Sequence, residues 1–330
     1  MQSNLLLAVG INIDGALDHD GIPPPSLDEQ FAMVRGHFDY VEKTLHAGES
    51  LGTFLDASSK HDVALGALGV IFQPGVDEAR GLEVIAQARS LSISIVNCQI
   101  RPPLGTDDVT ALDRMGGLYL KMLEEADGRT LPCLEPHVDM WFEQFSRVQP
   151  LADWLSARGA PLYLTIDHSH LIYRIDNPEQ LAAAGIGSIA QGRKLLWPAS
   201  EENYYRHWQS LGLIAHAHAR CVQINAPSNF GQMRHPEGLP GRGIQYPIST
   251  PSDDSEWEEQ RCEAWKEAVM QMLRWRAQHL DSPLRRISCE FIPYPDYGGG
   301  ARYSIFEQNL ACADWIRAAM VTVSIERQAT

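Results

Sequence analysis

The sequence predicts an α/β fold, a single (β/α)8 TIM barrel with extended loops at its C-terminal face. Apolar, β-prone runs alternate with helical segments along the whole chain. Four of the later runs each end in an acidic or imidazole side chain. The carboxyl ends of parallel barrel strands meet at one face, where active sites are built. No low-complexity linker interrupts the alternation, so we expect one domain over residues 1–330.

The first half of the chain contains four predicted strands. They are Leu5–Ile13, His37–Lys43, Val63–Phe72 and Ile93–Ile100. Ser26 and Glu29 form a capping box that predicts a helix start, and two further helices are expected at about 77–89 and from Asp107 or Asp108 to Ala126. Glu42 closes the second strand, and we interpret it as a structural residue or as a neighbour of the site.

The second half contains the other four strands. They begin at Leu131, Leu162, Leu213 and Ile287, and the last three end at Asp167, Val222 and Pro293. Helices are expected at 141–148, 151–157, 200–211, 255–280 and 305–320, and another after the Asn177-Pro178 pair. Residues 171–212 are longer than a single crossover helix requires, and a long loop follows the seventh strand as far as Pro251. Such excess on the carboxyl side of a barrel is typically substrate-facing.

The candidate site consists of the side chains that end these later strands. Glu135 and His137 are two residues apart, so on a strand they would face one cavity. Asp167 ends the sixth strand, His216 and His218 lie on the seventh, and Glu290 lies on the eighth. Glu135, Asp167, His218 and Glu290 form an oxygen-rich donor set with one nitrogen, which suits Mn²⁺ or Mg²⁺.

The order Glu, Asp-x-x-His, His, Glu resembles the xylose isomerase-like TIM barrels, the sugar isomerase and epimerase superfamily. The resemblance implies that Glu135, Asp167, His218 and Glu290 bind the metal and that Glu135 and Glu290 also act as the acid/base pair. It implies that His170 contacts substrate. Residues 240–243 match the Pro-Gly-x-Gly turn after the seventh strand. One departure is that 221–225 contains no arginine where the epimerases place a substrate-binding one.

The resemblance therefore predicts a divalent-metal-dependent isomerase or epimerase of keto-sugars, working by α-proton abstraction through a metal-stabilised enediolate. Mn²⁺, Co²⁺ and Mg²⁺ are the preferred ions, and Zn²⁺ is also compatible. The alternative is a lyase of the same superfamily acting on 3-oxo-glycosides, as C-glycoside deglycosidases do. An endonuclease IV-like nuclease and a sugar-binding barrel without catalysis are weaker alternatives.

Several residues keep two interpretations. His137 is either the proton acceptor or a residue that hydrogen-bonds Glu135 or the loop after it, and His216 is either a second ligand or a core histidine. His168 should point away from the face of Asp167. Trp141 and Trp197 are either walls of a sugar pocket or core residues. The glycine run 298–300 is weak evidence for a phosphate loop.

The composition limits the partners. The chain has 27 basic and 42 acidic residues, a net charge of −15, which argues against binding nucleic acid. Its six cysteines occur singly, as in reduced core thiols. We find neither a membrane-span pattern nor a signal pattern, so we expect a cytoplasmic protein with no membrane partner. The expected partner is a small-molecule carbohydrate, and homo-oligomerisation stays open.

Overall fold

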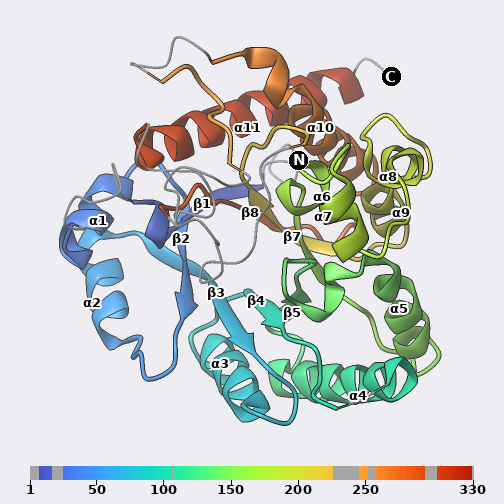
Figure 1. Ribbon diagram of the computed structural model, residues 1–330. Coiled ribbons are helices and arrows are strands. Elements are labelled where there is room, and N and C mark those ends of the chain that lie inside the picture. The colour runs from blue at the N-terminus through green and yellow to red at the C-terminus, as the bar shows by residue number, and fades with distance from the viewer. Residues whose placement is uncertain are drawn as a thin grey trace.

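The computed structural model describes residues 7–16, 25–105, 107–225, 245–251, 257–293 and 303–328. Within them, eight parallel strands close into a barrel in chain order, and the last strand pairs with the first. Helices surround the barrel, as Figure 1 shows. The predicted (β/α)8 TIM barrel is confirmed. The turn predicted at 240–243 and the glycine run at 298–300 lie outside the described residues.

All eight predicted strands are present, most of them shorter than predicted, and the second is shifted from His37–Lys43 to Tyr40–Leu45. They are β1 (Ala8–Asn12), β2 (Tyr40–Leu45), β3 (Ala64–Phe72), β4 (Ile95–Ile100), β5 (Leu131–Leu134), β6 (Leu164–Asp167), β7 (Ile214–Ala219) and β8 (Arg286–Cys289). The strands are easy to predict because a barrel buries both faces of its sheet, which makes each strand a nearly continuous apolar run.

The helices differ more from the prediction. They are α1 (Leu27–Val34), α2 (Gly52–His61), α3 (Glu78–Ser90), α4 (Asp108–Ala126), α5 (Val148–Ser156), α6 (Ser169–Ile172), α7 (Pro178–Ala183), α8 (Ile189–Leu196), α9 (Tyr204–Ser210), α10 (Glu263–Gln278) and α11 (Ile305–Gln328). Helix α2 was not predicted because it buries only Ala57 and so lacks an apolar stripe. The helix predicted at 141–148 consists of two short 3₁₀ turns followed by α5.

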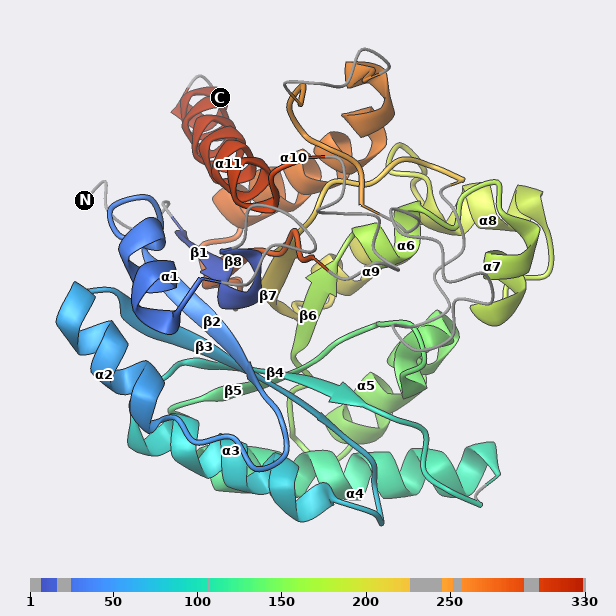
Figure 2. The ribbon, with the colours of Figure 1, turned by 60° about the vertical axis from the view of Figure 1, so that its left-hand side comes forward.

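Three of these helices, α6, α7 and α8, form a helical segment that follows the carboxyl end of β6. In Figure 2, α6, α7 and α8 lie together on the side toward which the arrow of β6 points. The carboxyl end of the barrel is therefore extended by the segment that the sequence predicts to be too long for a single crossover. None of the helices in the described ranges is long and apolar enough to span a bilayer.

The amino end of the barrel contains a buried aromatic ring, that of Tyr40, in one cluster with side chains such as Ile95, Leu131 and Cys133. Tyr40, the first residue of β2, is fully buried, and β1 and β3 each place a glycine against its ring. A Cβ atom on Gly10 would lie 2.4 Å from the ring, and one on Gly66 would lie 2.5 Å away. Its hydroxyl is 2.8 Å from the hydroxyl of Ser288 in β8. The barrel interior is therefore closely packed at this end, below the level of Glu42.

Candidate metal centre and active site

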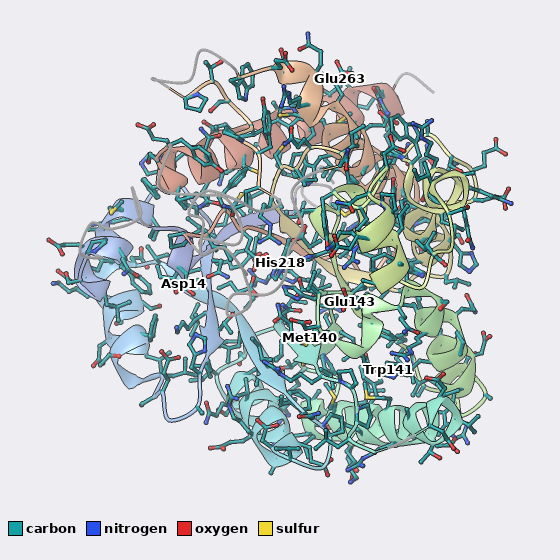
Figure 3. All side chains as sticks on the ribbon, in the orientation of Figure 1. Asp14, Met140, Trp141, Glu143, His218 and Glu263 are labelled. Carbon is teal, nitrogen blue, oxygen red and sulfur yellow. The ribbon has the colours of Figure 1, made fainter. Side chains whose placement is uncertain are left out.

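The polar interior lies at the carboxyl end of the barrel, because alternate residues of each strand point inward. Strand β2 continues from Tyr40 to Glu42, and Asp167 of β6 is in register with His218 of β7. Figure 3 shows His218 near the middle of the ring of helices. The inward polar side chains of this level are buried, and they are Asn12, Glu42, Asn97, Glu135, Asp167, His218, Arg220 and Glu290.

Glu135, His218 and Glu290 form the centre of the site. Nδ1 of His218 lies 3.4 Å from Oε1 of Glu135 and 3.2 Å from Oε2 of Glu290. One ligand atom from each of the three residues lies within 4.8 Å of the others. Oε1 of Glu135 and Nδ1 of His218 are buried and make no hydrogen bond within the described part of the chain. These residues fit a divalent cation, since two carboxylate oxygens and one imidazole nitrogen converge.

Asp167, the fourth predicted ligand, is engaged elsewhere. Its Oδ2 accepts a hydrogen bond of 2.5 Å from Nη2 of Arg220, and its Oδ1 accepts one of 2.8 Å from the backbone N–H of Ser169. Two other sets of three also bring ligand atoms within 4.8 Å of one another, and Asp167 belongs to none of the three sets in the described part of the chain. These two sets are Glu42, His216 and His218, and Glu135, His137 and His170. Burial raises the pKa of Asp167, and the guanidinium of Arg220 opposes this rise by favouring the carboxylate.

Amide side chains from the first half of the barrel orient the two glutamates. Oε2 of Glu135 accepts hydrogen bonds from Nδ2 of Asn97 at 2.6 Å and from Nε2 of Gln99 at 2.8 Å. Oε1 of Glu290 accepts one from Nδ2 of Asn12 at 3.3 Å. Each glutamate therefore has one oxygen held by an amide, while the other faces His218.

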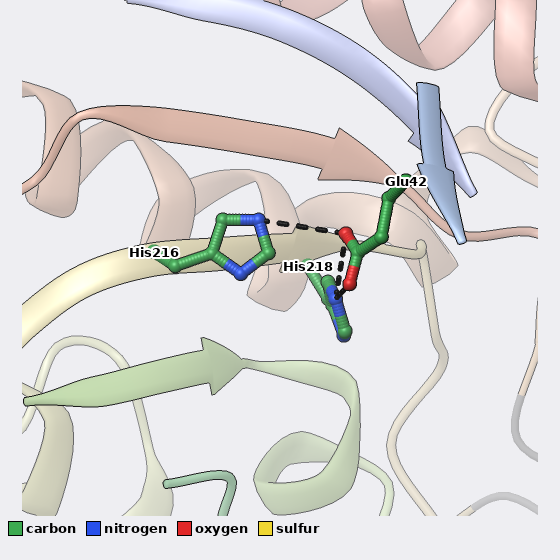
Figure 4. A group of neighbouring side chains, drawn as sticks. All are labelled: Glu42, His216 and His218. Atoms are coloured by element: carbon green, nitrogen blue, oxygen red, sulfur yellow. Dashed lines mark hydrogen bonds and ion pairs between the residues drawn. The ribbon is translucent and has the colours of Figure 1, made fainter. Parts of the chain in front are cut away.

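Glu42 holds the opposite edge of the His218 ring. Its two carboxylate oxygens lie 3.1 and 3.2 Å from Nε2 of His218. The same carboxylate lies 3.6 Å from Nε2 of His216, as Figure 4 shows. A carboxylate that accepts the N–H of one imidazole nitrogen leaves the other nitrogen to bind a metal. Glu42 thus belongs to the site as the neighbour that sets the orientation of His218.

His216 lies one layer below and is a hydrogen-bonded core histidine. Its Nδ1 is 3.2 Å from Oγ1 of Thr165, and its Nε2 is 3.1 Å from Oγ of Ser288. Burial lowers the pKa of His216 to about 4, so its imidazole is neutral. Of its two interpretations, these contacts favour the core role.

The charges of the central residues depend on one another. Burial alone would lower the pKa of His218, but three surrounding carboxylates, led by that of Glu290, raise it well above its ordinary value. Burial opposes the ionisation of Glu135 and Glu290, but the positive charge of His218 lowers the pKa of both carboxyl groups. The protonated imidazole therefore supplies the positive charge that these carboxylates require.

His137 and His170 lie side by side next to this centre, with ring centroids 4.0 Å apart. Nδ1 of His137 is 2.8 Å from the carbonyl oxygen of Val138, to which it must donate, so Nε2 is the nitrogen that can accept a proton. Burial, with the charges of His137 and Arg220, lowers the pKa of His170 well below its ordinary value. Because Arg220 donates to Nε2 of His170 at 3.1 Å, the proton of this neutral ring is on Nδ1.

The other residues named from the sequence lie outside this cluster. His168 is buried edge-on against Tyr205, which fits its predicted direction away from Asp167. Trp141 is buried against Phe142. Trp197 lines a cavity of about 600 Å³ together with residues such as Gln223 and Arg261, none of which contacts the central glutamates.

Sequence reasoning missed Arg220 and the orienting amides. Arg220 follows His218 by two residues, so the alternation that links His216 to His218 extends to it. Arg220 directly precedes residues 221–225, the stretch in which the resemblance to the epimerases predicts an arginine. Asn12, Asn97 and Gln99 carry no comparable signal, because asparagine and glutamine are common at strand ends for many reasons.

Comparison with solved structures identifies the fold. A putative xylose isomerase from Rhodospirillum rubrum has a TM-score of 0.55 at 11% identity, covering 95% of this chain and 99% of that chain. A xylose isomerase-like TIM barrel protein from Mycobacterium smegmatis, in complex with magnesium, has a TM-score of 0.54 at 12% identity, covering 98% and 100%. A D-tagatose 3-epimerase-like protein has a TM-score of 0.50 at 12% identity, covering 97% and 99%.

The chain therefore has the xylose isomerase-like TIM-barrel fold, as its resemblance to that superfamily implies. No protein-family model and no curated protein sequence matches it. Other similar structures include a probable dehydratase and an AP endonuclease. The fold alone therefore does not determine the reaction, which has to be argued from the site.

Proposed function

We propose that this chain is a divalent-metal-dependent isomerase or epimerase that removes an α-proton from a keto-sugar. The observation that carries the proposal is the convergence of Glu135 and Glu290 on Nδ1 of His218, with ligand atoms of all three within 4.8 Å. The M. smegmatis protein with this fold was solved with magnesium. When bound, a divalent ion supplies Lewis-acid polarisation of the substrate carbonyl, which eases loss of the neighbouring α-proton.

The side chains present can carry out the proton transfers. Glu135 and Glu290 have lowered pKa values and are therefore ionised at neutral pH, so a carboxylate oxygen of either can accept a proton. They come from β5 and β8, which are not adjacent strands and so approach a substrate from different directions. Nδ1–H of His170 can donate a hydrogen bond to a substrate oxygen.

A second candidate function is the lyase reaction on 3-oxo-glycosides, in which proton abstraction is followed by elimination. The orientation of His137 favours it. Because Nδ1 of His137 donates to the carbonyl of Val138, its Nε2 is the nitrogen that can act as a base, beside Glu135 and His170. In this reaction His137 would take the α-proton and the glutamates would remain ligands.

One experiment separates these functions. The protein, stripped with chelator and reloaded with Mn²⁺, Co²⁺, Mg²⁺ or Zn²⁺, is incubated in D₂O with a panel of keto-hexoses and keto-pentoses and with a 3-oxo-glycoside. We expect metal-dependent deuterium at the α-carbon of a keto-sugar, and its loss in Glu135→Gln. Release of aglycone from the 3-oxo-glycoside, with His137→Gln inactive but still loaded with metal, would instead establish the lyase.

The net charge of −15 leads us to propose that nucleic acid is not a substrate. Cleavage of an abasic DNA duplex by the metal-loaded protein would contradict this. Absence of exchange or elimination with every sugar and metal would contradict the enzyme proposal as a whole.

A further inference from the structure

Arg220 places a permanent positive charge inside the candidate site. Its side chain is fully buried at the end of β7. Nη2 donates to Oδ2 of Asp167 at 2.5 Å and to Nε2 of His170 at 3.1 Å, and Nε donates to Oγ of Ser169 at 3.2 Å. Its Nη1 lies 3.7 Å from Oε2 of Glu290. The guanidinium is thus held by the β6–α6 segment on one side and faces Glu290, the residue after β8, on the other.

The contacts of Asp167 differ in kind from those of the other three predicted ligands. Glu135 is held by uncharged amides, and His218 is held by the carboxylate of Glu42. Glu290 accepts a hydrogen bond from the amide of Asn12, and the guanidinium of Arg220 lies beyond hydrogen-bond distance from it, at 3.7 Å. Asp167 is held by a guanidinium through one oxygen and by a backbone N–H through the other.

Electrostatics favours keeping this pair intact. An arginine stays charged at any working pH, so a divalent ion bound to Asp167 would lie next to a fixed like charge. Moving Asp167 away from Arg220 would leave a buried cation without its closest partner, which is strongly unfavourable. The pair is therefore a poor source of a metal ligand and a stable part of the protein framework.

We infer that Asp167 is the partner of Arg220 and not a ligand of the ion proposed at Glu135, His218 and Glu290. This inference rests on the metal site proposed above. Three protein ligands leave the remaining coordination positions to water and substrate, as in catalytic metal sites of other proteins. Asp167 and Arg220 instead form a buried ion pair. Through its hydrogen bond to Nε2, Arg220 keeps His170 in the tautomer that donates from Nδ1.

The test removes the ion pair without changing the net charge. Mn²⁺ affinity and the visible spectrum of the Co²⁺-loaded protein are measured for wild type, Asp167→Asn, the double variant Asp167→Asn/Arg220→Met, and Glu290→Gln. Asp167→Asn alone should weaken binding because Arg220 loses its counter-charge. Adding Arg220→Met should restore the affinity to within about threefold of wild type, while Glu290→Gln should lose more than about 100-fold.

The Co²⁺ spectrum reports ligand number and geometry, so it should be the same in wild type and in the double variant. A changed spectrum, or a loss of affinity in the double variant as large as that in Glu290→Gln, would show that Asp167 is a ligand. Neither readout uses turnover, so neither depends on the substrate.

A crystal of the wild-type protein grown with Mn²⁺ gives an answer that does not depend on whether the variants fold. The anomalous peak should lie within about 2.6 Å of Glu135, His218 and Glu290 and farther than that from both oxygens of Asp167. An Asp167 oxygen inside that distance would overturn the inference. A wild-type protein that binds no Mn²⁺, Co²⁺, Mg²⁺ or Zn²⁺ would instead defeat the proposed function.

Discussion

The two halves of the barrel contribute different kinds of side chain to one site. Strands β5–β8 and the residues directly after them provide Glu135, His218 and Glu290, which face one another, and the Asp167–Arg220 pair. Strands β1, β2 and β4 provide side chains that contact those groups from behind, namely Asn12, Glu42, Asn97 and Gln99. The second half supplies ligands, and the first half sets their direction. A closed barrel allows this division because opposite strands share one interior.

The largest effects should come from the second half. Glu290→Gln and His218→Asn each remove a converging donor, so we expect Mn²⁺ affinity to fall by more than about 100-fold, beyond the range for residues outside the ligand set. Isothermal titration calorimetry measures it. Glu124→Gln, on the exposed side of α4, is the matched control and should bind as wild type does. If either site variant bound Mn²⁺ with wild-type affinity, the proposal that the second half supplies the ligands would be wrong.

Glu42 should give the next largest effect. Its carboxylate faces Nε2 of His218 and keeps Nδ1 toward the glutamates. Glu42→Gln retains an acceptor oxygen and should weaken Mn²⁺ binding about tenfold, whereas Glu42→Leu should weaken it about 100-fold. Glu49→Gln, an acid that pairs with Lys43 outside the barrel, serves as control. Equal loss in both Glu42 variants would mean that charge, and not orientation, is what the first half contributes.

The amides should matter less, since each is one donor among several contacts. Asn97→Leu removes one of the two donors to Oε2 of Glu135, and Gln99 remains, so we expect a loss of Mn²⁺ affinity of about tenfold. Asn12→Leu removes a longer bond of 3.3 Å and should cost less. The same titration checks both. If Asn97→Leu or Asn12→Leu lost as much Mn²⁺ affinity as Glu290→Gln, the two halves would not differ in the way proposed.

The smallest effect tests the framework of the second half without touching its ligands. The hydroxyl of Tyr173 donates to Gln180 and links α6 to α7, and burial raises the pKa of Tyr173 to about 12. The unfolded chain ionises near pH 10, so between pH 10 and 12 it releases a proton that the folded protein keeps. Stability should therefore fall as pH rises across this window, by about 1.4 kcal/mol per unit from this residue.

Denaturant unfolding at pH 8 to 12 measures this slope. Tyr173→Phe should lose some stability at pH 8, where the hydrogen bond is intact, but should show a shallower decline above pH 10. Mn²⁺ affinity at neutral pH should not change. If the unfolding free energy of Tyr173→Phe declined with pH as steeply as that of wild type, ionisation of Tyr173 would not be the cause of the decline.

The difference between the halves also explains which parts could be predicted from sequence. The eight strands could be predicted because each is buried on both faces, and the ligand-type residues stood out because acids and histidines are unusual at the ends of apolar runs. The amide partners could not be predicted, since Asn97 and Gln99 acquire meaning only when β4 lies beside β5. The pairing of Asp167 with Arg220 likewise depends on the register of β6 with β7, which no local pattern specifies.

The ring of Tyr40 between Gly10 and Gly66 has a kinetic consequence. Because this ring and its buried neighbours pack the amino end of the barrel, we expect an ion at Glu135, His218 and Glu290 and a sugar to enter from the carboxyl end. Binding would then be ordered, with the ion first and the sugar second, and a bound sugar would slow the departure of the ion. Exchange of a radioactive metal isotope should become slower as the concentration of a substrate analogue increases.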